Sequence, residues 1–226
     1  MNWLNKFERR HPRFGIQNIM IYVIVAMGFV YLANIVVTNV NFYEALMFNR
    51  TAILSGQIWR FITFIFLPPD SSILFIIITL YFYYFIGNAL EAEWGTVSFS
   101  MFYLIGMIGT IIGGFITGTA TNTYLNISLY FAFAIIYPNH PLYLFFFLPV
   151  KVKYLAFIAA LAYIISFITM SWPHRVSMLV SLINIAIFFG GTFVKRIKTN
   201  LKYSKTRRNF RQQNRQSKMD RDDRWR

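Results

Sequence analysis

The chain has 226 residues, of which 57% are hydrophobic and 19% aromatic, whereas only 13% are charged. Long apolar runs joined by short polar links exclude an ordinary soluble domain and indicate an integral membrane protein. No cysteine is present, which excludes disulfides and thiolate metal sites. The three histidines are far apart, and no phosphate-binding, dinucleotide-binding or zinc-protease motif occurs, so the sequence predicts neither a cofactor nor a metal.

The N-terminal third is predicted to contain one span and one long loop. Residues 1–14 form a basic arm, which we expect in the cytoplasm. Ile16–Val37 is an apolar run long enough to cross a bilayer, and it lacks the short core and cleavage site of a signal peptide. The loop 38–71 is rich in aromatic residues and ends in Pro68-Pro69. Its composition predicts an interfacial loop that does not cross the membrane.

Two further spans follow the loop. Span two is Ile73–Leu90, and span three is Val97–Thr117; the acidic link Glu91–Gly95 joins them. Gly109 and Gly113 in span three have the spacing that lets two membrane helices approach closely. We expect these glycines to serve helix packing.

The fourth apolar run, Tyr124–Tyr137, has only 14 residues. As a helix it would be about 21 Å long, which is short for a hydrocarbon layer of about 30 Å. Such a helix is best placed at the centre of a bundle, where its ends open into protein or a water-filled cavity. The next apolar stretch, Leu142–Leu148, is too short to cross and is expected to form a re-entrant or interfacial segment.

Spans five and six, Tyr154–Met170 and Val176–Val194, complete a membrane domain predicted over residues 15–194. Six spans place both termini on the same side of the membrane. If that side is the cytoplasm, the inner segments hold nineteen of the 22 Lys and Arg residues. This asymmetry predicts that both termini are cytoplasmic.

The C-terminal tail, residues 195–226, holds thirteen Lys or Arg and three Asp and has almost no apolar residue. This composition predicts a disordered basic tail. Beside a membrane, such a tail is expected to bind anionic lipid. Contact with a ribosome or nucleic acid is the second interpretation, and a solvated tail that only fixes the topology is the third.

Span six carries a polar stripe that begins just before it. His174, Ser177, Ser181 and Asn184 are spaced so that they lie on one helical face. Ser128 in span four is also polar, and buried polar groups are costly unless they are paired, so the two faces are expected to meet. One interpretation is hydrogen bonding between helices. The other is a serine nucleophile activated by a histidine base.

Three motifs, in this order among the six spans, resemble the rhomboid superfamily, including its derlin branch. They are Gly56–Arg60, Leu90–Gly95 and Pro149–Lys153. The resemblance implies an all-α membrane protein, a six-transmembrane-helix bundle with a short central fourth helix. It also implies that an arginine holds the outer loop and that a glutamate anchors the inner end of span two. The motif residues are Trp59, Arg60, Glu91, Gly95, Lys151 and Lys153.

Rhomboid proteases place a serine within Gly-x-Ser-Gly in span four and a histidine early in span six, and the resemblance assigns these positions to Ser128 and His174. The sequence departs from the protease pattern because both glycines are absent and Leu129 follows the serine. The span-two positions expected to hold His and Asn carry Phe75 and Thr79. Loss of one oxyanion donor alone costs about 10²- to 10³-fold in rate.

The resemblance to derlins and other inactive relatives therefore implies a non-proteolytic protein that binds transmembrane segments of client membrane proteins. An active intramembrane serine protease with a Ser128/His174 dyad is the first alternative. A transporter or channel is the second, although the spans carry almost no ionisable residue and show no inverted repeat. The expected location is a bacterial plasma membrane.

Overall fold

Apolar helices make up most of the computed structural model, which describes residues 10, 11, 14–37, 39, 41–69, 72–144 and 148–190. Asn2–Ala186 is one compact unit, and every contact discussed below lies within it. The predicted tail, residues 195–226, and most of the predicted arm lie outside the described residues.

Five helices in the described part of the chain are long and apolar enough to cross a membrane, and a sixth apolar helix is shorter. The shorter one is fourth in order and has 14 residues, as the sequence predicts. An all-α membrane bundle with a short fourth helix is thereby confirmed. The helices are α2 (Ile19–Val36), α6 (Ile73–Trp94), α7 (Thr96–Thr117), α8 (Thr123–Ile136), α9 (Val152–Thr169) and the last helix, Trp172–Gly190.

Two helix ends differ from the prediction by four residues. Helix α6 continues through most of the acidic link and stops at Gly95, whose φ of 82° favours glycine. The last helix begins at Trp172, so His174 lies in its first turn, whereas the sequence predicts that span six begins at Val176. Pro173 explains the early start, because proline suits the first helical turn, where backbone N–H groups have no partner within the helix. The predicted end of this helix at Val194 lies outside the described residues.

The segment after α8 forms an antiparallel hairpin, which the sequence analysis missed. Strand β3 (Pro141–Leu144) pairs with β4 (Leu148–Lys151), with Pro141 opposite Lys151. Pairing between the two strands satisfies backbone groups that a segment too short for a spanning helix would leave unpaired.

The loop before α6 contains only short elements within its described residues, and β1 fixes it to α7. The aromatic ring of Phe48 is fully buried, and a Cβ on Gly114 of α7 would lie only 2.6 Å from that ring. The interfacial position of the loop stays a prediction. The elements are α3 (Phe42–Leu46), β1 (Phe48–Asn49), α4 (Arg50–Leu54), α5 (Arg60–Thr63) and the 3-10 helix η1 (Phe64–Phe66), and β1 pairs with β2 (Thr119–Ala120).

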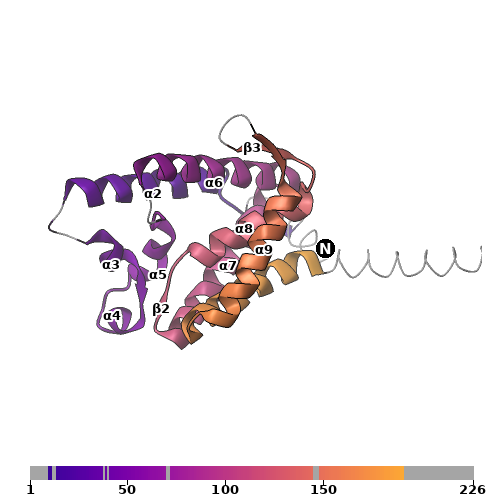
Figure 1. The fold of residues 1–226 in the computed structure, drawn as a ribbon. Helices are drawn as coiled ribbons and strands as arrows, with labels where there is room; N and C mark the ends of the chain where they lie inside the picture. The colour runs from indigo at the N-terminus through magenta and orange to yellow at the C-terminus, as the bar shows by residue number, and fades with distance from the viewer. Residues whose placement is uncertain are drawn as a thin grey trace, which may run out of the picture. The chain divides into compact units, whose positions relative to one another are not determined.

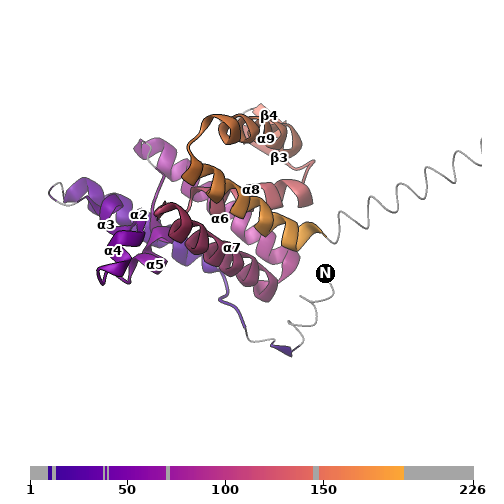
Figure 2. The same cartoon turned by 90° about the horizontal axis from the view of Figure 1, so that it is seen from below.

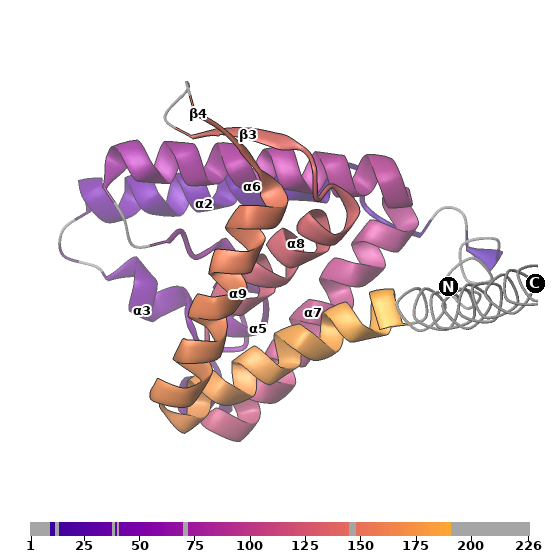
Figure 3. The same ribbon diagram turned by 45° about the vertical axis from the view of Figure 1, so that its right-hand side comes forward.

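The short helix α8 lies at the centre of this unit, as its length predicts. Helices α2 and α6 run side by side (Figure 1), and α8 packs against α6, α7 and α9. Figure 3 shows α8 between α6 and α9, and α7 packs against another side of α8. A helix too short to face lipid over a full span is thus packed against three longer helices.

Glycines let α7 and the last helix approach closely, as the small-residue spacing predicts (Figure 2). A Cβ on Gly109 would lie 2.7 Å from the Val180 side chain, whereas one on Gly113 would lie at an ordinary 3.5 Å. The tightest approach is at Gly106, where a Cβ would lie 2.4 Å from Leu125 and 2.7 Å from Asn184. The closest helix packing therefore lies beside the polar centre of the bundle.

Candidate functional site

Ser128 lies on the buried side of α8 and is fully inaccessible to solvent. Its Oγ donates a hydrogen bond to the carbonyl oxygen of Leu125 at 2.7 Å, so its proton is directed to its own helix. The Nδ2 of Asn184 donates to the same Oγ at 3.5 Å. The predicted meeting of the polar faces of span four and span six is confirmed, and the partner of Ser128 on the last helix is Asn184.

His174 is exposed and has its own local partners. Its Nδ1 lies 2.9 Å from the Oγ of Ser171, and its ring packs edge-on against Tyr124 with the centroids 6.4 Å apart. Tyr124 precedes Ser128 by four residues, or about 6 Å along α8. Asn184 follows His174 by ten residues, or about 15 Å along the last helix. The structure therefore places Asn184, and not the imidazole, level with Ser128, and the Ser128/His174 dyad stays a prediction.

The other members of the polar stripe make bonds typical of helix packing. Ser177 donates from Oγ to the carbonyl oxygen of Pro173 at 3.1 Å, within its own helix. Ser181 is buried, and its Oγ lies 3.4 Å from the hydroxyl of Tyr163 on α9. The stripe thus contacts α8 through Asn184 and α9 through Ser181, which supports the interpretation as interhelical hydrogen bonding.

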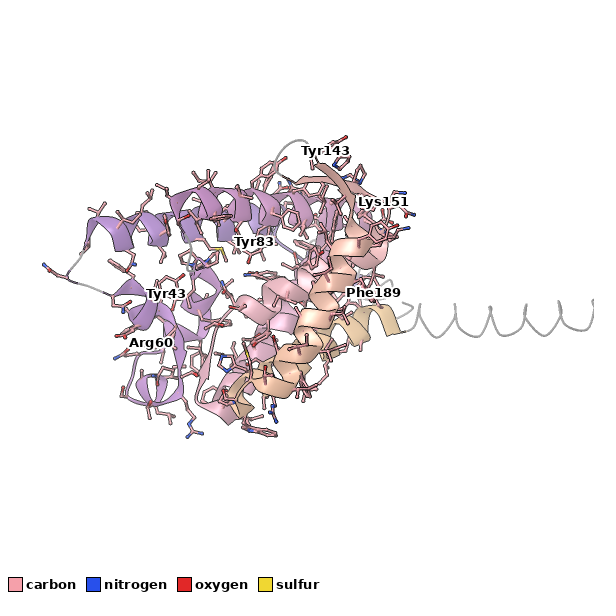
Figure 4. All side chains as sticks on the ribbon, viewed as in Figure 1. Tyr43, Arg60, Tyr83, Tyr143, Lys151 and Phe189 are labelled. Carbon is pink, nitrogen blue, oxygen red and sulfur yellow. The ribbon has the colours of Figure 1, made fainter. Side chains whose placement is uncertain are left out.

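A buried polar cluster next to Ser128 was missed by the sequence analysis. Asn126 on α8 is only 4% exposed, and its side chain lies close to Tyr83 of α6, which points inward in Figure 4. Among the described residues, the hydroxyl of Tyr103 and the Oδ1 atoms of Asn126 and Asn184 are buried without a hydrogen-bond partner. An asparagine within a 14-residue apolar helix was the available signal, because a buried amide requires partners.

One face of α8 remains part-exposed although the helix is central. We call it the aromatic face of α8; it consists of Tyr124, Ile127, Tyr130, Phe131 and Ile135. Tyr130 contacts Phe82 of α6 with ring centroids 6.2 Å apart, and Phe131 contacts Tyr163 of α9 at 5.7 Å. The face is therefore bordered by α6 on one side and α9 on the other.

Arg60 holds the loop before α6 together, as the resemblance implies. It is only 9% exposed, and its guanidinium donates to the carbonyl oxygens of Glu44 and Met47 and to Oε1 of Gln57. These three acceptors belong to different parts of the loop, and Figure 4 shows Arg60 among the short loop helices. Trp59 beside it is 52% exposed and has one long bond, 3.4 Å from Nε1 to the carbonyl oxygen of Ala45.

Glu91 joins the start of α2 to the turn between α6 and α7. Its carboxylate accepts bonds from the backbone N–H of Asn18, 3.1 Å from each oxygen, and from Oγ1 of Thr96 at 2.8 Å. Gly95 makes the turn itself, with φ at 82°. These contacts support the anchoring role that the resemblance implies for Glu91 at this end of α6, and that role stays a prediction.

Lys151 and Lys153 lie where the hairpin meets α9, and both are exposed. The Nζ of Lys153 lies 5.2 Å from the centre of the Tyr154 ring, within the range of a cation–π contact. The backbone N–H of Lys153 donates to Pro138 at the end of α8. The backbone of this motif therefore fixes the connection between α8 and α9, and Figure 4 shows Lys151 at the hairpin.

Within the described ranges, no three His, Cys, Asp or Glu side chains gather in a way that could hold a metal ion.

Comparison with known proteins identifies the family. A family model described as "Eukaryotic integral membrane protein (DUF1751)" matches residues 20–195, which is most of the chain. A search of curated proteins found no match. The family is eukaryotic, so the expected bacterial plasma membrane is not supported. The match agrees with the resemblance seen in the motifs and with the six apolar helices: the chain belongs to the DUF1751 family of eukaryotic integral membrane proteins, within the rhomboid-like superfamily.

Proposed function

We propose that this protein is a non-proteolytic, rhomboid-like membrane protein that binds transmembrane segments of client membrane proteins. The observation that carries the proposal is the aromatic face of α8, which stays part-exposed although α8 packs against three other helices. A central helix that served packing alone would be covered on all sides.

The chemistry of this face suits a transmembrane helix. Tyrosine and phenylalanine rings offer large apolar area with little conformational freedom to lose on binding. Because lipid tails are as apolar as a client helix, association in the bilayer depends on close packing and on hydrogen bonds.

The short length of α8 supports the same proposal. The helix has 14 residues, about 21 Å, against a hydrocarbon thickness of about 30 Å. Short helices are accommodated by local thinning of the bilayer, at a modest free-energy cost per ångström of mismatch. A client helix with a short or partly polar span would reduce that cost and would therefore be recruited.

The contacts of Ser128 support the non-proteolytic part of the proposal. A nucleophilic serine must transfer its proton to a base, whereas the Ser128 hydroxyl donates to Leu125 and accepts from Asn184. An exposed histidine bonded to Ser171 is not poised to take that proton.

The experiment is site-specific photocrosslinking in native eukaryotic membranes. A photoreactive phenylalanine analogue replaces Tyr130 on the aromatic face, and in a second variant it replaces Ile127. The control carries the analogue at Phe29, which is 73% exposed on α2 and far from α8 in sequence. We expect discrete protein adducts at Tyr130 and Ile127 and only lipid adducts at Phe29.

The identity of the adducts decides the outcome. Mass spectrometry should locate the crosslinked client residue within a transmembrane segment. Adducts confined to soluble domains of other proteins, or equal protein labelling at all three positions, would contradict client binding at this face.

A further inference from the structure

Asn49, Arg50 and Thr51 form the sequence pattern Asn-x-Thr, in which the middle residue is not proline. In eukaryotic proteins this pattern is the acceptor for an N-linked glycan when it lies in a surface loop outside the cytoplasm. Short patterns also occur by chance, so the place in the fold and in the membrane decides whether this one can be used. The structure places it in the loop before α6, across β1 and the start of α4.

The geometry of the pattern leaves the acceptor nitrogen available. The Oδ1 of Asn49 accepts a hydrogen bond from the Oγ1 of Thr51 at 2.6 Å and another from the backbone N–H of Ala52 at 3.1 Å. Within the described residues, these are the hydrogen bonds of the Asn49 side chain, and both use its oxygen. A glycan is joined to Nδ2 and leaves the carbonyl oxygen as an acceptor. Both hydrogen bonds are therefore compatible with the modified side chain.

The pattern lies on a polar, exposed edge of the unit. Asn49 is part-exposed, whereas Arg50 and Thr51 are exposed. In the β1–β2 pair, Asn49 lies opposite Thr119, which is exposed as well. Phe48, the preceding residue of the strand, is fully buried. Because successive side chains of a strand point to opposite faces, β1 directs its phenylalanine into the unit and its asparagine outward.

The pattern also lies at one end of the membrane unit. The backbone N–H of Arg50 donates to the carbonyl oxygen of Gly118 at 2.8 Å, just beyond the end of α7, and Figure 1 shows α4 and β2 at the same end. Helix α7 has 22 residues, about 33 Å, which matches a hydrocarbon layer of about 30 Å. Asn49 is therefore about one membrane thickness from Thr96 and from the start of α2, which Glu91 fixes beside Thr96.

The predicted topology places this end on the non-cytoplasmic side. The sequence predicts that α2 enters the membrane from the cytoplasm, so the loop after α2 lies across the membrane. For a eukaryotic protein inserted at the endoplasmic reticulum, that side is the lumen. Asn49 follows Val36, the last residue of α2, by thirteen residues, and an extended chain of that length reaches as far as about 45 Å. The acceptor can thus meet a luminal enzyme before the loop folds.

A second match to the pattern, Asn126-Ile127-Ser128, has the opposite surroundings. It lies within α8, where Asn126 is only 4% exposed and Ser128 is fully buried. A site inside a spanning bundle is out of reach of an enzyme that works in the aqueous lumen. The chain therefore carries its own internal control for the surroundings that glycosylation requires.

We propose that Asn49 is an N-glycosylation site. The donor is a lipid-linked pyrophosphate oligosaccharide, and the enzyme is the oligosaccharyltransferase of the endoplasmic reticulum. In the transfer, the Nδ2 of Asn49 forms a bond to C1 of the first sugar while the bond between C1 and the pyrophosphate oxygen breaks. The lipid pyrophosphate leaves, and one Nδ2 proton passes to a base of the enzyme. The glycan then covers the β1–β2 edge with a hydrophilic group.

The experiment expresses the tagged, full-length protein in eukaryotic cells and compares its electrophoretic mobility before and after digestion with peptide N-glycosidase F. We expect a single step to higher mobility on digestion. Asn49→Gln and Thr51→Ala should each remove the slower form completely, whereas Thr51→Ser retains the hydroxyl and should keep that form. Ser128→Ala destroys only the second pattern and should leave the mobility step unchanged.

The unmodified protein keeps the test decisive if a variant does not fold. The glycosidase converts the modified asparagine to aspartate, and digestion in water enriched in heavy oxygen labels the new carboxylate, which mass spectrometry should locate at Asn49. Absence of a digestible form, beside a known glycoprotein made in the same cells, would overturn the proposal. A label at Asn126, or a mobility step that persists in Thr51→Ala, would do the same.

Discussion

Asn184 on the last helix donates its Nδ2 hydrogen to the Oγ of Ser128 on α8, across 3.5 Å in a buried environment. The same Oγ donates to Leu125 within α8. The polar atoms at the centre of the bundle are thus arranged to join helices. His174, which a serine protease would use as the base, lies exposed against Ser171 and Tyr124.

The first prediction concerns proteolysis. Unmodified protein in proteoliposomes should not cleave a generic rhomboid model substrate, and Ser128→Ala and His174→Ala should behave like it. The physical reason is that the serine proton is engaged by Leu125 and the imidazole is bonded elsewhere. Cleavage is measured by gel analysis of the substrate over several hours.

An active rhomboid protease in the same lipid mixture serves as the control for that assay. Cleavage that is abolished by both alanine substitutions would establish the dyad and refute the non-proteolytic proposal. Cleavage that survives both would indicate a contaminating protease.

The second prediction concerns the close approach at Gly106. In Gly106→Ala, the added methyl would lie 2.4 Å from the Leu125 side chain and 2.7 Å from the Asn184 side chain, so these buried side chains must shift. Such overpacking typically costs about 1–3 kcal/mol. We expect a lower thermal unfolding midpoint in detergent, read by intrinsic fluorescence.

Gly113→Ala is the matched control on the same helix, because its Cβ would meet Val180 at an ordinary 3.5 Å. Its effect on the unfolding midpoint should be small, since alanine also has the higher helix propensity. Equal destabilisation by the two substitutions would contradict the assignment of the tightest contact to Gly106.

Much of the fold could be predicted because the bilayer demands about 20 apolar residues per spanning helix. The same rule singled out α8, which is too short to face lipid and lies at the centre of the unit. Helical periodicity predicted that Asn184 lies on one polar face of span six. The cost of burying unpaired polar groups predicted that this face meets Ser128 of span four.

The missed features depend on how segments are combined. Asn126 meets Tyr83 only because α6 and α8 are rotated toward each other, and neither sequence segment specifies that rotation. The hairpin Pro141–Lys151 requires pairing between two strands of four residues, each too short to show a pattern.

The third prediction concerns the basic tail, residues 195–226, which we propose binds anionic lipid. A synthetic tail peptide should sediment with vesicles containing phosphatidylserine and not with pure phosphatidylcholine vesicles. Each basic residue near the surface contributes roughly 1 kcal/mol, and salt should weaken the binding. Binding that is independent of lipid charge would contradict this proposal, and tighter binding to RNA than to anionic vesicles would favour the alternative partner.

The fourth prediction concerns the loop before α6. Arg60→Ala removes a guanidinium that donates to the carbonyl oxygens of Glu44 and Met47 and to the side chain of Gln57. Hydrogen bonds to charged groups contribute roughly 1.5–3 kcal/mol each to stability. We expect much faster limited proteolysis within residues 41–69, with the remaining helices still protected. Arg50→Ala is the control, since that exposed side chain donates only to the carbonyl oxygen of Phe115, at 3.1 Å. If both substitutions left the loop equally resistant to protease, Arg60 would not be what holds it, and the packing of β1 against α7 would have to suffice.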